Sequence, residues 1–135
     1  MDNLIEFLWK NSVHKGNSLA YRYLETGEVA GPRLEITWLE LANKVKATAA
    51  LLQTQAQVGD RALLLYGPGL DFIVAICACF ASGVIAVPSY PPKINRINQT
   101  LPRLQSIILD AGVKLVLTSS KLLKVTEPIV LKLMS

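Results

Sequence analysis

The sequence predicts an α/β fold: a mostly parallel sheet flanked by helices in the order β-α-β-α-β-α, preceded by a helix, a β-hairpin and a helix. Residues 61–66 and 84–87 are short apolar runs without polar alternation, which is typical of strands that helices cover on both faces. The apolar stretch 70–82 between them has the length of a buried helix. A further helical pattern leads to a third such run at 113–118. Strands joined through helices in this way are parallel, and we expect a right-handed crossover.

The chain opens with a predicted helix from Leu4 to Val13, which Asp2 or Asn3 can cap. Residues 14–17 then form a loop. The lone His14 in that loop has no second ligand near it in the sequence, so it predicts neither a metal site nor a general base. A β-hairpin with a long tip follows, with strands at 19–24 and 34–36 and a turn at 25–28.

The second helix starts with a capping box. In Thr37-Trp38-Leu39-Glu40, the Thr37 hydroxyl accepts from the third helical amide while Glu40 reaches back. We expect Glu40 also to pair with Lys44 at i, i+4. The helix fades over residues 53–57, and Gly59-Asp60 turns the chain into the first parallel strand. Six apolar residues recur at the helical period and predict the packed face: Trp38, Leu41, Ala42, Val45, Ala49 and Leu52.

Turn residues punctuate the central unit. Gly67-Pro68-Gly69 ends the first parallel strand. Asp71 places a negative charge in the first turn of the helix Leu70–Ser82, where it complements the helix dipole. Gly83 is expected to close this helix, and Pro88 to stop the second parallel strand.

The last third of the chain repeats the pattern less clearly. Residues 93–100 are polar and without period, which predicts a surface loop. The next helix is expected to have Thr100 as its cap and Pro102 in its first turn, where a missing amide costs least. Gly112 ends this helix before the third strand. Ser119-Ser120 then caps a final helical piece that a later proline interrupts.

The length of 135 residues fits one domain, and the composition indicates that part of its surface packs against a partner. The chain is 51% hydrophobic and only 18% charged, drier than a typical small soluble domain. We therefore expect the remainder of a larger protein to cover part of it. Residues 1–92 carry seven basic and eight acidic side chains, a net charge of −1, whereas residues 93–135 carry seven basic and two acidic ones, a net charge of +5. No interleaved aromatics accompany this basic third, so a solvated or docking face is favoured over nucleic-acid binding.

The sequence predicts neither a disulfide or metal site at its cysteines nor a membrane-spanning segment. Cys77 and Cys79 lie two residues apart on a helix and project to nearly opposite sides, so they can neither pair nor chelate together and are expected to be buried. The uncharged run 72–87 has 16 residues, fewer than a transmembrane span needs. The N-terminus shows no secretory signal, so a cytoplasmic location follows by default.

Ligands of open parallel sheets bind beyond the carboxyl ends of the strands, and three loops are expected there. The loop 66–69 contains a proline and matches no phosphate-binding fingerprint. The loop 89–92 offers no charge; its Tyr90 could line an apolar cavity, but filling the core is favoured. In the loop 118–121, hydroxyls and Lys121 at a helix start could hold a phosphate, although a structural cap is favoured; loss of ATP affinity in Lys121→Ala would identify a site. We therefore predict no catalytic, cofactor-binding or metal-binding residue in this chain.

Seven motifs follow one another in order along the chain: Leu19-Ala20-Tyr21-Arg22-Tyr23-Leu24, Thr37-Trp38-Leu39-Glu40-Leu41-Ala42, Tyr66-Gly67-Pro68-Gly69-Leu70-Asp71-Phe72, Gly83-Val84-Ile85-Ala86-Val87-Pro88, Tyr90-Pro91-Pro92, Leu101-Pro102-Arg103-Leu104 and Asp110-Ala111-Gly112. Together they resemble the N-terminal subdomain of fatty-acyl-AMP ligases, which are adenylate-forming enzymes of the AMP-dependent synthetase/ligase superfamily. Two positions depart from the family pattern: Gly67 stands where a second proline is usual, and Trp38 where tyrosine is usual.

The resemblance implies an enzyme that uses ATP and Mg²⁺ to activate a long-chain fatty acid as acyl-AMP, for transfer to an acyl carrier protein or polyketide synthase. The family's Gly/Ser/Thr-rich lysine loop, its acidic metal support, its ribose-binding aspartate and its C-terminal lysine have no counterpart in residues 1–135. We therefore expect the chain to be the N-terminal portion of an AMP-binding domain, truncated before the phosphate-binding loop, to bind no cofactor alone, and to be inactive alone. The alternatives are a segment of a fatty-acyl-CoA ligase or amino-acid adenylation domain, and a truncated non-catalytic interaction module.

Overall fold

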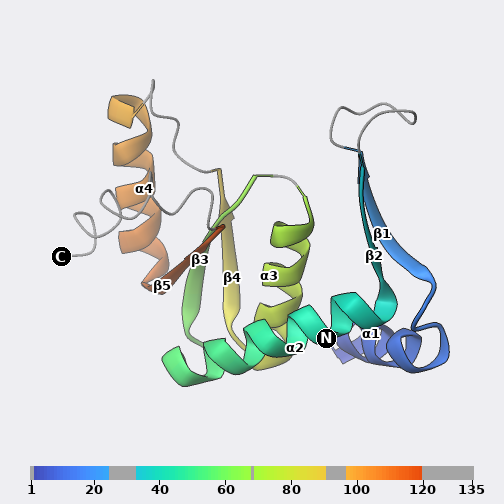
Figure 1. Cartoon of the computed structure of the whole chain (residues 1–135). Coiled ribbons are helices and arrows are strands. Elements are labelled where there is room, and N and C mark those ends of the chain that lie inside the picture. The colour runs from blue at the N-terminus through green and yellow to red at the C-terminus, as the bar shows by residue number, and fades with distance from the viewer. Residues whose placement is uncertain (1, 25–32, 68, 91–96, 120–135) are drawn as a thin grey trace.

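The computed structural model describes residues 2–24, 33–67, 69–90 and 97–119. Four helices and five strands lie within these ranges (Figure 1). The predicted turn at 25–28, the proline cluster at 91–92 and the helical piece after Ser119 lie outside the described residues. The elements are α1 (Asp2–His14), β1 (Leu19–Leu24), β2 (Arg33–Thr37), α2 (Trp38–Gln55), β3 (Arg61–Leu65), α3 (Leu70–Ser82), β4 (Ile85–Ser89), α4 (Ile97–Ala111) and β5 (Val113–Thr118).

The predicted parallel sheet is confirmed, with strand order β4-β3-β5. Leu63 of the central strand β3 lies opposite Val87 on one side and Val116 on the other, and both pairings are parallel. The four residues Ala62–Leu65 are fully buried, at 0% exposure. An uninterrupted apolar run in β3 is therefore explained by burial on both faces of the sheet.

Helices cover the two faces of this sheet separately. Successive side chains of a strand point to opposite faces. Accordingly Leu64 belongs to one core cluster with Leu52 of α2 and Ala78 of α3, whereas Leu65 belongs to a second cluster with Leu104 of α4. The sheet is thus the middle layer, with α2 and α3 on one face and α4 on the other (Figure 1).

The capping box at the start of α2 is confirmed. The Glu40 amide donates to the Thr37 hydroxyl at 3.2 Å, and the Thr37 amide donates to the Glu40 carboxylate at 2.9 Å. Hydrogen bonding of the Glu40 carboxyl group by the Thr37 backbone and side chain, followed by the charge of Lys44, lowers the pKa of Glu40 from its ordinary value of 4.5. The predicted Glu40–Lys44 ion pair does not form as a contact, because the carboxylate turns back to the cap. Five of the six residues predicted for the packed face are buried, and Trp38 is partly buried.

The prediction that Pro88 stops its strand is wrong, because β4 continues through it to Ser89. Ile85 donates its amide to the Asp60 carbonyl at 2.8 Å, so alternate amides of β4, those of residues 85, 87 and 89, face β3. Position 88 then faces away from β3, on the open edge of the sheet. No described strand pairs with β4 on that side, so the amide that proline lacks has no partner strand among the described elements, and the strand tolerates proline there.

The start of α4 and the end of α1 also differ from expectation. Helix α4 begins at Ile97, so residues 97–100 are not a loop, Thr100 is not the cap, and Pro102 lies inside the helix. The first four amides of any helix lack partners within the helix. Pro102 lies only just beyond them, so it removes one backbone hydrogen bond of the helix. The first helical turn, residues 97–100, was not predicted because its sequence shows no apolar residues at the helical period. His14, expected in a loop, is the last residue of α1.

The hairpin forms a sheet of its own. Strands β1 and β2 pair antiparallel, with a register shift between Leu19 and Tyr21, and they share no pairing with the parallel sheet. Figure 1 shows them as an arm that rises from the α1 and α2 end of the molecule. An ion pair between Arg22 and Glu35, at 3.0 Å, crosses the exposed face of the hairpin.

Both cysteines are buried and free, as predicted. Burial raises the pKa of the Cys77 thiol, and raises that of Cys79 to about 11. Both thiols are therefore protonated and unreactive near neutral pH. Within the described part of the chain, no helix combines the length and the apolar character that crossing a bilayer requires.

Candidate functional site

The carboxyl edge of the parallel sheet brings together the three loops that the sequence places there. Leu65 lies opposite Ser89 of β4 and Thr118 of β5, so the three strands end at one level. Tyr66, which directly follows β3, contributes to two separate cavities at this edge. One cavity has charged and hydroxyl side chains in its lining, whereas the lining of the other is mainly apolar, and we call them the polar cavity and the apolar groove.

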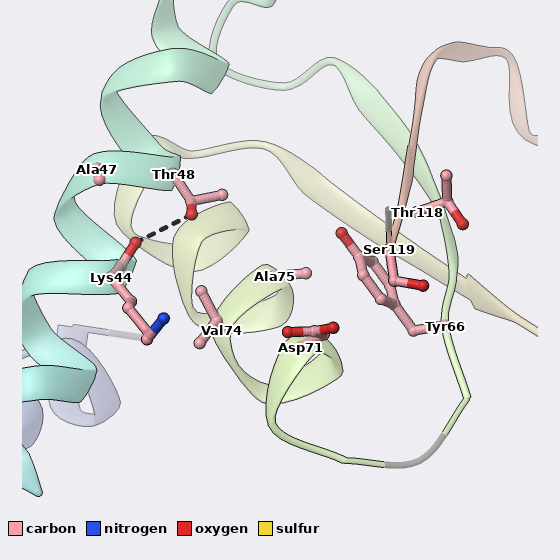
Figure 2. Close-up of a pocket in the computed structure, with 9 residues that line it drawn as sticks. All are labelled: Lys44, Ala47, Thr48, Tyr66, Asp71, Val74, Ala75, Thr118 and Ser119. Carbon is pink, nitrogen blue, oxygen red and sulfur yellow. Dashed lines mark hydrogen bonds between the residues drawn. The ribbon is translucent and has the colours of Figure 1, made fainter. Parts of the chain in front are cut away.

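The polar cavity lies between α2, α3 and the end of β5 and has a volume of about 350 Å³ (Figure 2). Among the described residues that line it, Lys44 is the one cation and Asp71 the one carboxylate, and they belong to different helices. Figure 2 shows Tyr66 and Ser119 on the side of the cavity opposite Lys44. Its lining residues are Lys44, Ala47, Thr48, Tyr66, Asp71, Val74, Ala75, Thr118 and Ser119.

Two hydroxyls of the polar cavity are engaged within the fold. Thr48 donates to the Lys44 carbonyl at 2.9 Å, and Thr118 donates to the Leu65 carbonyl at 2.8 Å, which ties the end of β5 to β3. Their hydrogens are therefore not available to a ligand, although the oxygens still accept.

Tyr66 is held neutral at this edge. Burial, followed by the charges of Asp71 and Cys79, raises the pKa of the Tyr66 hydroxyl to about 12. The phenol therefore stays protonated at physiological pH. It can form hydrogen bonds or line the two cavities, but it cannot act as a general base.

The apolar groove, on the other side of Tyr66, runs over the ends of β3 and β4 from α3 to α4 and has a volume of about 700 Å³. Tyr90 lines it and is 81% exposed, so the expectation that Tyr90 fills the core is wrong. The residue follows the end of β4, which is an edge strand of the described sheet, and no described helix or strand covers it there. The described residues that line it are Tyr66, Gly67, Phe72, Pro88, Ser89, Tyr90, Arg103 and Ile107.

Arg103 crosses from α4 to the end of β4. Its guanidinium donates to the Ser89 hydroxyl at 2.7 Å and to the Tyr90 carbonyl at 3.2 Å. These two bonds fix the orientation of the guanidinium at the rim of the groove. Sequence reasoning did not select Arg103, because a single arginine on a helix has no local signal that shows which strand it will reach.

The phosphate-binding hypotheses receive no support from the described residues. Asp71 stands in the first turn of α3, so this helix start already carries an anion that would repel a phosphate. Ser119 lines the polar cavity, whereas Ser120 and Lys121 lie outside the described residues. In the described ranges, no group of three His, Cys, Asp or Glu side chains could hold a metal ion.

The three-layer arrangement with a β4-β3-β5 sheet is the N-terminal part of the adenylate-forming enzyme fold. The chain belongs to the AMP-binding enzyme family, whose model matches residues 9–134. The resemblance drawn from the sequence motifs is thereby confirmed.

Individual relatives point to one branch of that family. The chain is 41% identical over 115 residues to the medium-chain-fatty-acid–acyl-carrier-protein ligase JamA of Moorena producens, covering 85% of this chain and 19% of the relative. A fatty acid AMP ligase from Legionella pneumophila superposes with a TM-score of 0.78 at 32% identity, over 90% of this chain and 20% of that one. A Legionella pneumophila fatty acyl-adenylate ligase solved with acyl adenylate and pyrophosphate gives a TM-score of 0.77 at the same identity and coverage. The chain thus spans about a fifth of the length of the proteins it matches.

Proposed function

We propose that this chain forms the N-terminal segment of a fatty-acyl-AMP ligase, an enzyme that joins a long-chain fatty acid to the AMP part of ATP and passes the acyl group to an acyl carrier protein or polyketide synthase. The observation that carries the proposal is the agreement of fold and sequence with the two Legionella ligases, at TM-scores of 0.78 and 0.77. The acceptor is suggested by the carrier-protein activity in the name of JamA.

The segment acts as a scaffold in this proposal. ATP and Mg²⁺ would be bound by groups outside residues 1–135, since the described residues offer neither a metal ligand set nor a glycine-rich lysine loop. Residues 1–135 would then be the N-terminal portion of the AMP-binding domain, ahead of its phosphate-binding loop. Its physical contribution is a rigid edge: Leu63, Leu64 and Leu65 are completely buried, so the residues that follow them are held in fixed positions.

Two assays test the proposal. The 135-residue chain, incubated with ATP, Mg²⁺ and dodecanoate, should give no hydroxamate on trapping with hydroxylamine, because the groups that stabilise the transition state are absent. A chimera in which the matched fifth of the Legionella ligase is replaced by this chain should form acyl-AMP at a rate within about tenfold of the parent, since a scaffold contributes position rather than chemistry.

The control is the same Legionella ligase without its matched fifth, which should be inactive. A folded chimera without activity would contradict the proposal, and so would acyl-AMP formation by the 135-residue chain alone. Coenzyme A offered to the chimera in place of an acyl carrier protein reports whether the acceptor assignment holds.

A further inference from the structure

The polar cavity offers a ligand mainly hydrogen-bond acceptors. Thr48 and Thr118 each donate their hydroxyl hydrogen to a backbone carbonyl, so each oxygen can accept a further hydrogen bond but not donate one. The carboxylate of Asp71, in the same lining, is an acceptor only. A ligand that bonds to these oxygens must therefore be a donor, and a primary ammonium group, which carries three N–H donors, has that chemistry.

Two opposite charges stand on different walls of the cavity, Lys44 on the α2 side and Asp71 on the α3 side (Figure 2). They do not pair with each other, and within the described part of the chain the ion pair that forms joins Arg22 and Glu35. Glu40, one turn from Lys44, is engaged in the cap of α2. A singly charged ligand would satisfy one wall and be repelled by the other, whereas a ligand with an ammonium at one end and a carboxylate at the other satisfies both.

The size and the walls of the cavity limit the ligand further. Its volume of about 350 Å³ is near the lower end of the range for small-molecule sites. Val74, Ala75 and Tyr66 add apolar surface to the lining. A short methylene chain can be buried against these side chains, but a long one cannot be accommodated.

We propose that the polar cavity binds a small ω-amino acid, whose ammonium bonds to Asp71 and whose carboxylate bonds to Lys44, with its methylene chain against Val74 and Tyr66. The proposal rests on this lining and not on the ligase assignment, and the site lies on the other side of Tyr66 from the apolar groove. Lys44 and Asp71 are both exposed, so solvent weakens each contact, and we expect a dissociation constant of roughly 1 mM.

The test is an NMR titration of the isotope-labelled 135-residue chain, which reports both the affinity and the location of binding. The ligands are glycine, β-alanine, γ-aminobutyrate, δ-aminovalerate and ε-aminocaproate. Affinity should pass through a maximum along this series, because the two charges of the ligand must match the separation between Lys44 and Asp71. Saturable shifts should centre on the amides of Thr48, Asp71 and Ala75. The alkylammonium and the alkanoate with the chain length of the best ligand should each bind about fivefold more weakly.

Charge substitutions identify the two ends of the site. Asp71→Asn, which keeps the shape of the side chain, should weaken the best zwitterion by about fivefold and weaken the alkylammonium, but not the alkanoate. Lys44→Gln should weaken the zwitterion by a similar factor and show the reverse preference between the two singly charged compounds. A dispersed amide spectrum of each variant shows that it is folded.

A steric pair of variants tests the location independently. Ala47 is an exposed lining residue of α2, so Ala47→Leu should fill the cavity without disturbing the helix, and should abolish the saturable shifts. Gly67→Leu is the matched control in the apolar groove. A Cβ at Gly67 would meet no atom within 4 Å, and its φ is not positive, so the sheet stays intact and zwitterion binding should be unchanged.

Absence of a saturable shift with every member of the series would overturn the proposal, and so would equal affinity for the zwitterion and the two singly charged compounds. Shifts centred on β4 and α4, or binding that survives Ala47→Leu, would place the ligand elsewhere and overturn it as well. None of these outcomes bears on the ligase assignment, which the chimera tests.

Discussion

The two sheets of this protein are built from similar local signals and reach different degrees of burial. In the parallel sheet, helices cover both faces, and Leu63, Leu64 and Leu65 are fully buried. In the hairpin, Leu34 is 46% exposed and Leu19 is 43% exposed. A two-stranded sheet cannot bury its own apolar side chains. A strand's contribution to stability therefore depends on the layers that pack against it rather than on its own sequence.

The largest effect is expected in β3. Leu64→Ala should lower the free energy of unfolding by about 2 to 5 kcal/mol, because it leaves a cavity between the central strand and helices α2 and α3. Leu34→Ala in the hairpin is the matched change and should cost less than about 1 kcal/mol, since its side chain is already half exposed. Urea denaturation followed by circular dichroism measures both. Equal costs would show that the hairpin is as well packed as the sheet.

A smaller effect is expected at the turn between α3 and β4. Gly83 has a φ of 76°, and a Cβ there would lie 3.1 Å from the Val58 side chain. Gly83→Ala should therefore destabilise the fold by about 1 to 2 kcal/mol, combining left-handed strain with a close contact. Gly67→Ala, without positive φ or a neighbour, should change the denaturation midpoint little. A neutral Gly83→Ala would mean that this turn does not constrain the sheet.

The capping box joins the two regions, because Thr37 is the last residue of β2 and the cap of α2. Thr37→Ala should cost about 1 kcal/mol. The pKa of Glu40 is lowered in the folded state, so its contribution is present above the ordinary value of 4.5 and is lost as pH falls through the lowered value. Melting temperatures of the wild type and Glu40→Gln should thus differ at pH 7 and converge as the pH falls well below 4.5. A difference that persists in acid would argue against the carboxylate as its source.

The smallest effect is expected on the hairpin surface. The Arg22–Glu35 pair is about half exposed on both sides, so solvent screens it. Arg22→Gln should change the free energy of unfolding by less than about 0.5 kcal/mol. A larger loss in urea denaturation would show that the hairpin is held by its ion pair more than by its backbone pairing.

Local patterns predicted most elements of this fold. The apolar run in β3, the buried helix Leu70–Ser82 and the closing Gly83 appear as expected, because burial on both faces demands continuous apolar sequence. The proline predictions failed at Pro88 and Pro102. The missing amide of a proline destabilises a strand only where an adjacent strand would accept its hydrogen bond. The amino-acid sequence does not show which strand lies at the edge of a sheet.

For the candidate site, the edge of the sheet could be predicted from the sequence, but the side chains that gather there could not. Parallel topology placed the loops after β3, β4 and β5 at one edge, and the sequence alone was enough for that inference. Lys44 joins that edge from α2 in the polar cavity, and Arg103 joins it from α4 in the apolar groove. Both are distant in the chain from the residues that they meet.

The order of strands and helices, the family and the cap of α2 can all be predicted from the amino-acid sequence, because each depends on residues close together in the chain. Only the packing of separate elements shows that Tyr66 divides a polar cavity from an apolar groove, that Tyr90 faces outward, and that a cation stands at the groove's rim. Helical and strand periods describe which side of one element is apolar, whereas a site depends on how several elements pack together in space.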